Sequence, residues 1–394
     1  MTIQLDEAQL TRVARRALDS GQATLLDHEV SPLPYDAYLP GRTVARVHGH
    51  AVVAGQRASW SAILKWTDAQ ATTPRAPVER ARREALAYQS GLLDLDGELR
   101  APRAYEIDLA DDGRVALWLE DIGQEDVEPW ALDTYATAAH ALGHFNGTFL
   151  VRQPPLEAWL VPDWAVRQSE PLDMAVALAD IAEHASDLRA RRALGHDVGE
   201  RVASMLRDQP RFIAELAMLP QTLCHHDAAR SNLMVRRLAG GGTQVVAIDW
   251  ESTGPGPVGA EIATLVSASL RKGDFPADRV AELEAAVVEA YVRGLRDAGC
   301  STDARIVRLG YAMSLALRCW FVRDTLHNLT DPLAAPMFGR APDVPPGEVL
   351  DAFVLVSRFL LHRAAEARAL AGTLLPAISA TSRAAGEAEP AYRG

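Results

Sequence analysis

The sequence predicts an α+β protein with two lobes, a small β-rich N-terminal lobe and a large, mostly helical C-terminal lobe. Three observations support this fold class. Strand-like alternation of apolar residues is concentrated in the first third of the chain, helical periodicity dominates from about residue 130, and one short hairpin is embedded in the helical part. We expect the N-terminal lobe over residues 1–122, the C-terminal lobe over 123–374 and a disordered tail over 375–394.

The N-terminal lobe is expected to begin with an amphipathic helix over residues 5–20, which lacks the apolar core of a signal peptide. Residues 42–54 and 60–66 alternate apolar and polar side chains around the turn "GQRAS", a pattern typical of a β-hairpin. Residues 77–93 have helical periodicity. Residues 115–123, "VALWLEDIG", are expected to form a strand that runs into a polar turn.

The C-terminal lobe is predicted to be helical except around its embedded hairpin. Helical periodicity begins with residues 135–150 and continues, rich in Asp and Arg, to about residue 218. The strands "NLMVRRL" and "QVVAIDW" follow, joined by the glycine run 240–242, which suits a tight connection. Further helices are expected over residues 276–299, 303–326 and 347–372. There is no internal repeat.

Composition excludes several classes of function. The 394 residues are 48% hydrophobic and 23% charged, as in globular proteins, with a net charge of −12. This charge argues against a nucleic acid or an anionic membrane as partner and is compatible with a cationic small substrate. Three scattered cysteines indicate a reducing compartment, and no apolar run reaches the length of about 18 residues that spans a membrane, so we expect a cytoplasmic protein. The oligomeric state is left open.

Lysine is nearly absent. Only Lys65 and Lys272 occur among 40 basic residues. Lysine carries a compact charge on a slim stem, whereas arginine is a wide planar fork. Lys65 is therefore a candidate for a position that arginine does not suit.

The segments "CHHDAARSNLMV" and "VVAIDWESTGPGP" place polar side chains next to apolar strands. Phosphoryl transfer from a nucleotide requires a cation on the phosphates, oxygen ligands for Mg²⁺ and a carboxylate beside the acceptor hydroxyl. Asp227 is the candidate carboxylate. Asn232 and Asp249 offer the hard oxygen ligands that Mg²⁺ prefers, and antiparallel pairing of the two strands would bring their loops together. His225 is expected to hold the first loop through a hydrogen bond to the backbone.

The string "HHDAARSN" followed by "IDWE" resembles the H-x-D-x-x-x-x-N and I-D pair of the aminoglycoside phosphotransferase and choline kinase-like families, which share the protein-kinase-like fold. The downstream "GPVGAEIATLV" resembles the segment in which a glycine turn leads to an acidic residue and an apolar helix. The resemblance covers residues 40–330. It implies an ATP-dependent phosphotransferase in which Asp227 is catalytic and Asn232 and Asp249 bind Mg²⁺.

The resemblance extends to the N-terminal lobe. "WSAILKW" resembles the strand whose lysine, Lys65, holds phosphate, and "RREALAYQSGL" resembles the helix whose glutamate, Glu84, pairs with that lysine. "LWLEDIG" resembles the hinge that receives adenine, with Leu119, Glu120, Asp121 and Ile122 as its residues. Two features depart from the pattern. His226 stands where family members often have glycine, and no clear glycine-rich phosphate loop is present, so the choice between ATP and GTP stays open.

Each candidate has a structural alternative. A single aspartate such as Asp227 is by default typical of a turn or a helix cap, and a lysine between apolar residues, such as Lys65, is typical of an edge strand. Glu84 has Arg80 as a helical neighbour, and Glu79 is a rival partner for Lys65. A zinc site at Cys224, His225 and His226 is disfavoured, because consecutive residues of a strand point to opposite sides and no second ligand pair follows. Arg230 suits either a substrate anion or a loop cap, and Trp320 suits either an acceptor pocket or the core.

The predicted function is transfer of the ATP γ-phosphate to a hydroxyl of an aminoglycoside-like or other antibiotic or sugar acceptor. Carboxylates in the region 163–208 favour an amino sugar, although charge runs are usually solvated faces; among them are Glu170, Asp173, Asp180 and Glu183. One alternative is a kinase for a choline-, sugar- or nucleoside-type metabolite. Another is a non-catalytic nucleotide-binding protein, which has no need of the complete Lys–Asp–Asn–Asp set.

Overall fold

The computed structural model describes residues 5–33, 41–68, 76–94, 97–123, 129–153, 157–169, 173–238, 241–331 and 345–387. These residues divide into two units. The first comprises the chain up to residue 127 together with Val246–Thr253, and the second comprises residues 128–245 and the chain from Gly254 onward. The segment Val246–Thr253 therefore packs with the N-terminal unit, although it lies far downstream in the sequence.

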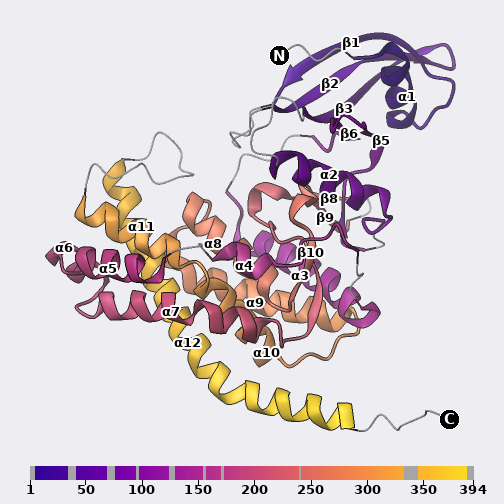
Figure 1. The fold of residues 1–394 in the computed structure, drawn as a ribbon. Coiled ribbons are helices and arrows are strands. Elements are labelled where there is room, and N and C mark those ends of the chain that lie inside the picture. Colours follow the sequence, from indigo (N-terminus) through magenta and orange to yellow (C-terminus); the bar gives the residue numbers. More distant parts are fainter. Residues whose placement is uncertain are drawn as a thin grey trace. The chain divides into compact units, whose positions relative to one another are not determined.

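The first unit is built on an antiparallel sheet with the strand order β1-β2-β3-β6-β5. Its elements are α1 (Glu7–Ala17), β1 (Thr24–Pro32), β2 (Arg42–Val53), β3 (Gln56–Thr67), α2 (Ala76–Gln89), β4 (Leu99–Arg100), β5 (Ala104–Leu109), β6 (Val115–Glu120) and the short helix η2 (Trp250–Ser252) (Figure 1).

One face of this sheet is the core of the first unit. Leu10 and Val13 of α1 pack there with Leu64 and Trp118. Because side chains alternate along a strand, Lys65 lies on the opposite face from Leu64. Strand β3 runs between β2 and β6, so the edge-strand interpretation of Lys65 is wrong.

Local details of this sheet differ from the prediction. The β2–β3 turn consists of Ala54 and Gly55, whose φ angles of 48° and 80° suit a two-residue hairpin turn, so it is shorter than the predicted "GQRAS" turn. Strand β1 was not predicted. It lies at the sheet edge with mostly exposed side chains, and it therefore lacks the apolar alternation that reveals a half-buried strand.

The second unit is mostly helical (Figure 1). Its helices are α3 (Leu132–Arg152), α4 (Trp164–Gln168), α5 (Met174–Ala185), α6 (Leu188–Leu194), α7 (Val198–Leu216), α8 (Ala260–Lys272), α9 (Val280–Asp297), α10 (Ala304–Ala316), α11 (Cys319–Thr330) and α12 (Pro346–Glu387), with short helices η1 (Arg230–Asn232) and η3 (Ala277–Arg279). Its strands are β7 (Gln221–Cys224), β8 (Leu233–Arg237) and β10 (Gly254–Pro257), and β9 (Thr243–Ala247) runs from this unit into the first.

In the second unit, some helices begin or end at other residues than predicted. The predicted helix over residues 303–326 is two helices, interrupted at Leu317–Arg318. Strands β8 and β9 correspond to the predicted hairpin, whose Gly240 lies outside the described residues. Helix α12 extends into residues 375–387 of the predicted tail, and residues 388–394 lie outside the described part. No helix of the described residues has the length and apolar character needed to cross a membrane.

Helices α3 and α9 approach closely and position β7. A Cβ atom on Gly143 would lie 2.2 Å from the Tyr291 carbonyl oxygen, so this contact requires glycine. The buried Asn146 of α3 then donates to the Leu223 carbonyl of β7 at 2.8 Å and accepts a hydrogen bond from the Tyr291 hydroxyl at 2.7 Å. Strand β7 leads directly into the polar loop at His225.

Candidate active site

Lys65 lies within a cluster of buried charges in the first unit. Its Nζ is 2.7 Å from Glu84 Oε1 on α2 and 3.0 Å from Asp249 Oδ1, just after β9. The Lys65 and Glu84 side chains are only 11% and 1% exposed. Glu84 is thus the glutamate that pairs with Lys65, whereas the rival Glu79 lies in the first turn of α2.

Arg42 and Glu251 complete this cluster, and sequence reasoning gave them no role. Arg42 Nη1 lies 2.6 Å from Glu251 Oε2, and Arg42 Nη2 lies 3.7 Å from Glu84 and 3.6 Å from Asp249. Arg80 also contacts Glu251 rather than Glu84, at 3.7 Å. The only local signals were an arginine at the start of an apolar strand and an acidic residue two positions after Asp249. Lys65, Arg42 and the more exposed Arg80 therefore offset the charge of three clustered carboxylates.

The charge of Lys65 is strongly stabilised. Burial by itself would lower the pKa of Lys65, but the negative charges of Asp249 and Glu84 act in the opposite direction and raise it above its usual value. An ammonium that stays charged while mostly shielded from water acts more strongly on a nearby anion than a solvated one.

The predicted hinge residues occupy the end of β6 and the turn after it. The backbone N–H of Glu120 donates to Arg103 O at 2.8 Å, and its carboxylate pairs with Arg100 at 2.6 Å. The Asp121 carboxylate accepts from Ser61 Oγ at 2.5 Å and from Arg46 Nε at 2.7 Å. Both carboxylates thus hold this segment through ion pairs and hydrogen bonds. Leu119 lies opposite Ile63 of β3, and Ile122 is partly buried after the strand.

A hollow of about 650 Å³ lies in the first unit beside this hinge. Arg46, His48 and Ser61 contribute to its lining, together with Asp121 and Gly123. Arg46 and His48 lie opposite Ile63 and Ser61 in the β2–β3 register, so these side chains share the Lys65 face of the sheet. The volume is in the range of small-ligand pockets.

The loop that carries Asp227 is held in place by hydrogen bonds to the side chain of Glu261 in α8. The Glu261 carboxylate accepts the backbone N–H groups of His225 at 2.7 Å and His226 at 3.0 Å. Burial raises the pKa of Glu261 to about 7, while these two hydrogen bonds act in the opposite direction. The acidic residue of "GPVGAEIATLV" is therefore a fully buried anchor for the loop.

Asp227 and Asn232 lie together in the second unit. Asn232 Nδ2 donates to the Asp227 backbone oxygen at 2.8 Å and to Asp227 Oδ2 at 3.0 Å. The Asp227 backbone N–H in turn donates to His225 Nδ1 at 3.2 Å, so His225 does bond the loop backbone. Because the amide nitrogen of Asn232 faces Asp227, its carbonyl oxygen is the atom suited to a metal ligand.

The sequence of this chain matches the model of APH, the phosphotransferase enzyme family, over residues 50–299. The chain belongs to this phosphotransferase family. The match confirms the resemblance seen in the motifs, and it covers both the strand of Lys65 and the loop of Asp227. Together with the β-rich first unit and the helical second unit, it confirms the two-lobed protein-kinase-like α+β fold class.

Solved structures of phosphotransferases and kinases are similar to this chain at low identity. An aminoglycoside phosphotransferase from Alicyclobacillus acidocaldarius subsp. acidocaldarius is 15% identical, with 96% of this chain and 98% of that chain covered and a TM-score of 0.46. A microcompartment-associated aminopropanol kinase is 17% identical over 91% and 98%, with a TM-score of 0.46. A choline/ethanolamine kinase family protein from Mesorhizobium loti is 16% identical over 92% and 99%, with a TM-score of 0.40. No curated protein sequence matches.

His226 is the clearest departure of this family member from the motif. Its φ of 65° lies in the left-handed region that favours glycine. The imidazole stacks on Trp164, with ring centroids 4.8 Å apart, and its Nε2–H donates to the Pro255 carbonyl at 3.0 Å. Burial lowers the pKa of His226 to about 3, so the ring is neutral. Gly256 leaves the necessary room, because a Cβ there would lie 2.4 Å from the ring.

His226→Ala should destabilise the protein by about 2 kcal/mol, because it removes a buried aromatic contact and keeps the unfavourable backbone angle. His226→Gly should be about 1 kcal/mol more stable than His226→Ala, because glycine adopts a positive φ without steric cost. Urea unfolding of the two variants measures the difference. Equal stabilities would show that the left-handed backbone at this position carries no strain.

Several sequence alternatives are decided by the structure. Arg230 lies 3.5 Å from Asp274 and stacks over Trp130, which fits a loop-capping role. Cys224, His225 and His226 are absent from the groups of converging metal-ligand atoms found among the described residues. In the acidic region, Asp173 caps α5, and Glu183 is exposed. Glu170 lies outside the described residues.

Proposed function

We propose that this phosphotransferase family member transfers the γ-phosphate of ATP to a hydroxyl of a small molecule. The observation that carries the proposal is the buried contact of Lys65 with Glu84 and Asp249. An ammonium held by two carboxylates is preorganised to neutralise phosphate charge that develops during transfer. The hollow beside Asp121 is the proposed place of the nucleotide base, with Leu119, Glu120 and Ile122 forming the hinge around it.

Asp227 is the proposed catalytic carboxylate. Its hydrogen bond from Asn232 fixes one of the two carboxylate oxygens. The other oxygen would orient the acceptor hydroxyl and take its proton late in the transfer, as a carboxylate does in related phosphoryl-transfer chemistry. The Glu261 anchor keeps the loop backbone in place while the proton moves.

The donor set fits Mg²⁺. Oxygen atoms of Asp249, Glu84 and Glu251 lie within 4.8 Å of one another. Hard oxygen ligands of this kind are those that Mg²⁺ prefers, and the amide oxygen of Asn232 is a further proposed ligand. We propose Asp249 and Asn232 as the metal ligands. Glu84 and Glu251 would stay in their ion pairs with Lys65 and Arg42 and would not bind the metal. When bound, Mg²⁺ would neutralise charge on the nucleotide phosphates.

The acceptor is proposed to be a hydroxylated amino sugar of the aminoglycoside type or a related antibiotic or sugar. The net charge of −12 favours a cationic acceptor. An acceptor panel of aminoglycosides, neutral sugars, nucleosides, choline and ethanolamine tests this. The readout is formation of ADP from ATP or of GDP from GTP. We expect ADP formation with at least one amino sugar, at a rate about 10²- to 10⁴-fold lower in Asp227→Asn. If only choline or nucleosides were phosphorylated, the proposed amino-sugar acceptor would be wrong. If no acceptor were phosphorylated, a non-catalytic nucleotide-binding protein would be favoured.

Removing a metal ligand should uncouple nucleotide binding from Mg²⁺. We expect Asp249→Ala to lose most of the increase in ATP affinity that Mg²⁺ confers on the unmodified protein, and Asn232→Ala to lose a smaller part, because it removes a neutral ligand. Calorimetric titrations of ATP with and without Mg²⁺ measure this linkage, with the exposed Asp278→Ala as control. Unchanged linkage in both ligand variants would place the ion elsewhere.

A further inference from the structure

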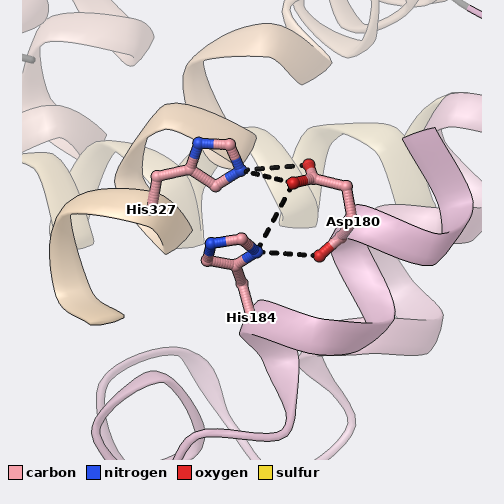
Figure 2. Close-up of side chains that lie close together, drawn as sticks. All are labelled: Asp180, His184 and His327. Atoms are coloured by element: carbon pink, nitrogen blue, oxygen red, sulfur yellow. Dashed lines mark hydrogen bonds and ion pairs between the residues drawn. The ribbon is translucent and has the colours of Figure 1, made fainter. Parts of the chain in front are cut away.

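Two helices of the second unit bring together a histidine–carboxylate cluster that the transfer reaction does not use. Asp180 and His184 lie one helical turn apart on α5, and His327 reaches them from α11 (Figure 2). His327 Nε2 is 3.0 Å from both Asp180 carboxylate oxygens, and His184 Nδ1 is 3.5 Å from Asp180 Oδ1. Figure 2 shows the two imidazoles facing the same carboxylate.

The spacing of these atoms matches a metal-ligand set. One ligand atom from each of the three residues can be chosen so that all lie within 4.8 Å of one another. Tetrahedral zinc sites have metal–ligand distances of about 2.0–2.1 Å, which place neighbouring ligand atoms about 3.3 Å apart. The two imidazoles favour zinc and similar transition metals, whereas Mg²⁺ prefers ligand sets made of oxygen alone. A fourth position would be open to water.

We propose that Asp180, His184 and His327 form a site for a divalent transition-metal ion, best matched by Zn²⁺, that joins α5 to α11. The three side chains are 25%, 22% and 34% exposed, so an ion can reach them from solvent. The site is separate from the Mg²⁺ ligands proposed above, because it combines nitrogen with oxygen and lies wholly within the second unit.

Two neighbouring features affect metal binding at this site: the proton on His184 and the positive charge of Arg323. His184 Nδ1 lies 2.9 Å from the Asp180 backbone oxygen, so coordination through Nδ1 requires its proton to move to Nε2. Arg323 Nη2 lies 3.3 Å from Asp180 Oδ2. A carboxylate has enough lone pairs to serve a cation at each oxygen. The nearby guanidinium should nevertheless weaken metal binding through repulsion between like charges.

Zinc titration of the full-length, chelator-treated protein tests the site. Excess Mg²⁺ is included so that the all-oxygen carboxylate cluster in the first unit is occupied. We expect one Zn²⁺ per chain, with the affinity reduced at least about 10-fold in Asp180→Asn and in His327→Gln. His140→Gln is the matched control, because His140 pairs with Asp297 at 2.8 Å and belongs to none of the groups of three converging ligand residues found among the described residues. Circular dichroism establishes that each variant is folded, and thermal unfolding should show zinc stabilisation only in the unmodified and control proteins.

A second variant tests the position of the ion. Arg323→Met removes the cation beside Asp180 and should tighten zinc binding several-fold. Co²⁺ bound at the site should also show visible absorption that Asp180→Asn and His327→Gln lose. Failure of the unmodified protein to bind Zn²⁺ would overturn the proposal. So would equal affinity in all variants, or weaker binding in Arg323→Met, and none of these outcomes bears on the proposed kinase activity.

Discussion

Asp227→Asn should bind nucleotide as the unmodified protein does and lose about 10²- to 10⁴-fold in turnover, because an amide cannot take the acceptor proton. The substitution nearly preserves shape. Asparagine keeps an oxygen that can accept the hydrogen bond from Asn232 Nδ2, which lies 3.0 Å from Asp227 Oδ2. The loop should therefore stay folded over Glu261, so that a loss of turnover reports chemistry rather than unfolding.

Two measurements are needed for Asp227. Nucleotide affinity comes from calorimetry, and turnover comes from ADP formation with the acceptor found in the panel. Asp274→Asn is the control, because Asp274 is another partly buried carboxylate of the second unit and pairs with Arg230. A folded Asp227→Asn variant with near-normal turnover would remove Asp227 from the mechanism.

Lys65→Arg should reduce kcat/KM for ATP by about 10²-fold or more, nearly as much as Lys65→Ala, although it conserves charge. The ammonium lies 2.7 Å from Glu84 and 3.0 Å from Asp249, and the Arg42 guanidinium already lies 3.7 Å and 3.6 Å from the same two carboxylates. A second planar fork would need room that the cluster does not have, and it would place two guanidinium groups side by side.

The charge-conserving control is Lys272→Arg. Lys272 donates from an exposed position to Ser231 Oγ at 2.9 Å, a bond that arginine can also make, so this variant should be silent. Rates are compared at limiting and saturating ATP. Full activity of Lys65→Arg under both conditions would show that the proposed role of Lys65 on phosphate is wrong.

Much of the candidate site could be predicted, because the spacing of its residues within single loops and strands follows local patterns. Asp227 and Asn232 are five positions apart in one loop, so a linear motif captures their contact. Strand alternation placed Lys65 on the face opposite Leu64, and the scarcity of lysine in the chain singled it out. Strand β1 could not be predicted, because its side chains are mostly exposed and an exposed strand does not show alternating apolar residues.

The α+β class, the family and the polar loop with Asp227 and Asn232 could all be predicted from the sequence, because periodicity and short motifs involve only a few neighbouring positions. Three contacts could not be predicted from local patterns, because they join distant segments of the chain: Arg42 with Glu251, Glu261 with the loop backbone at His225, and His327 with Asp180. Burial explains the difference. A charged group that is removed from water requires a partner of opposite charge or a hydrogen-bonding partner. That partner lies in a segment that packs nearby in the fold, which can be far away in the sequence.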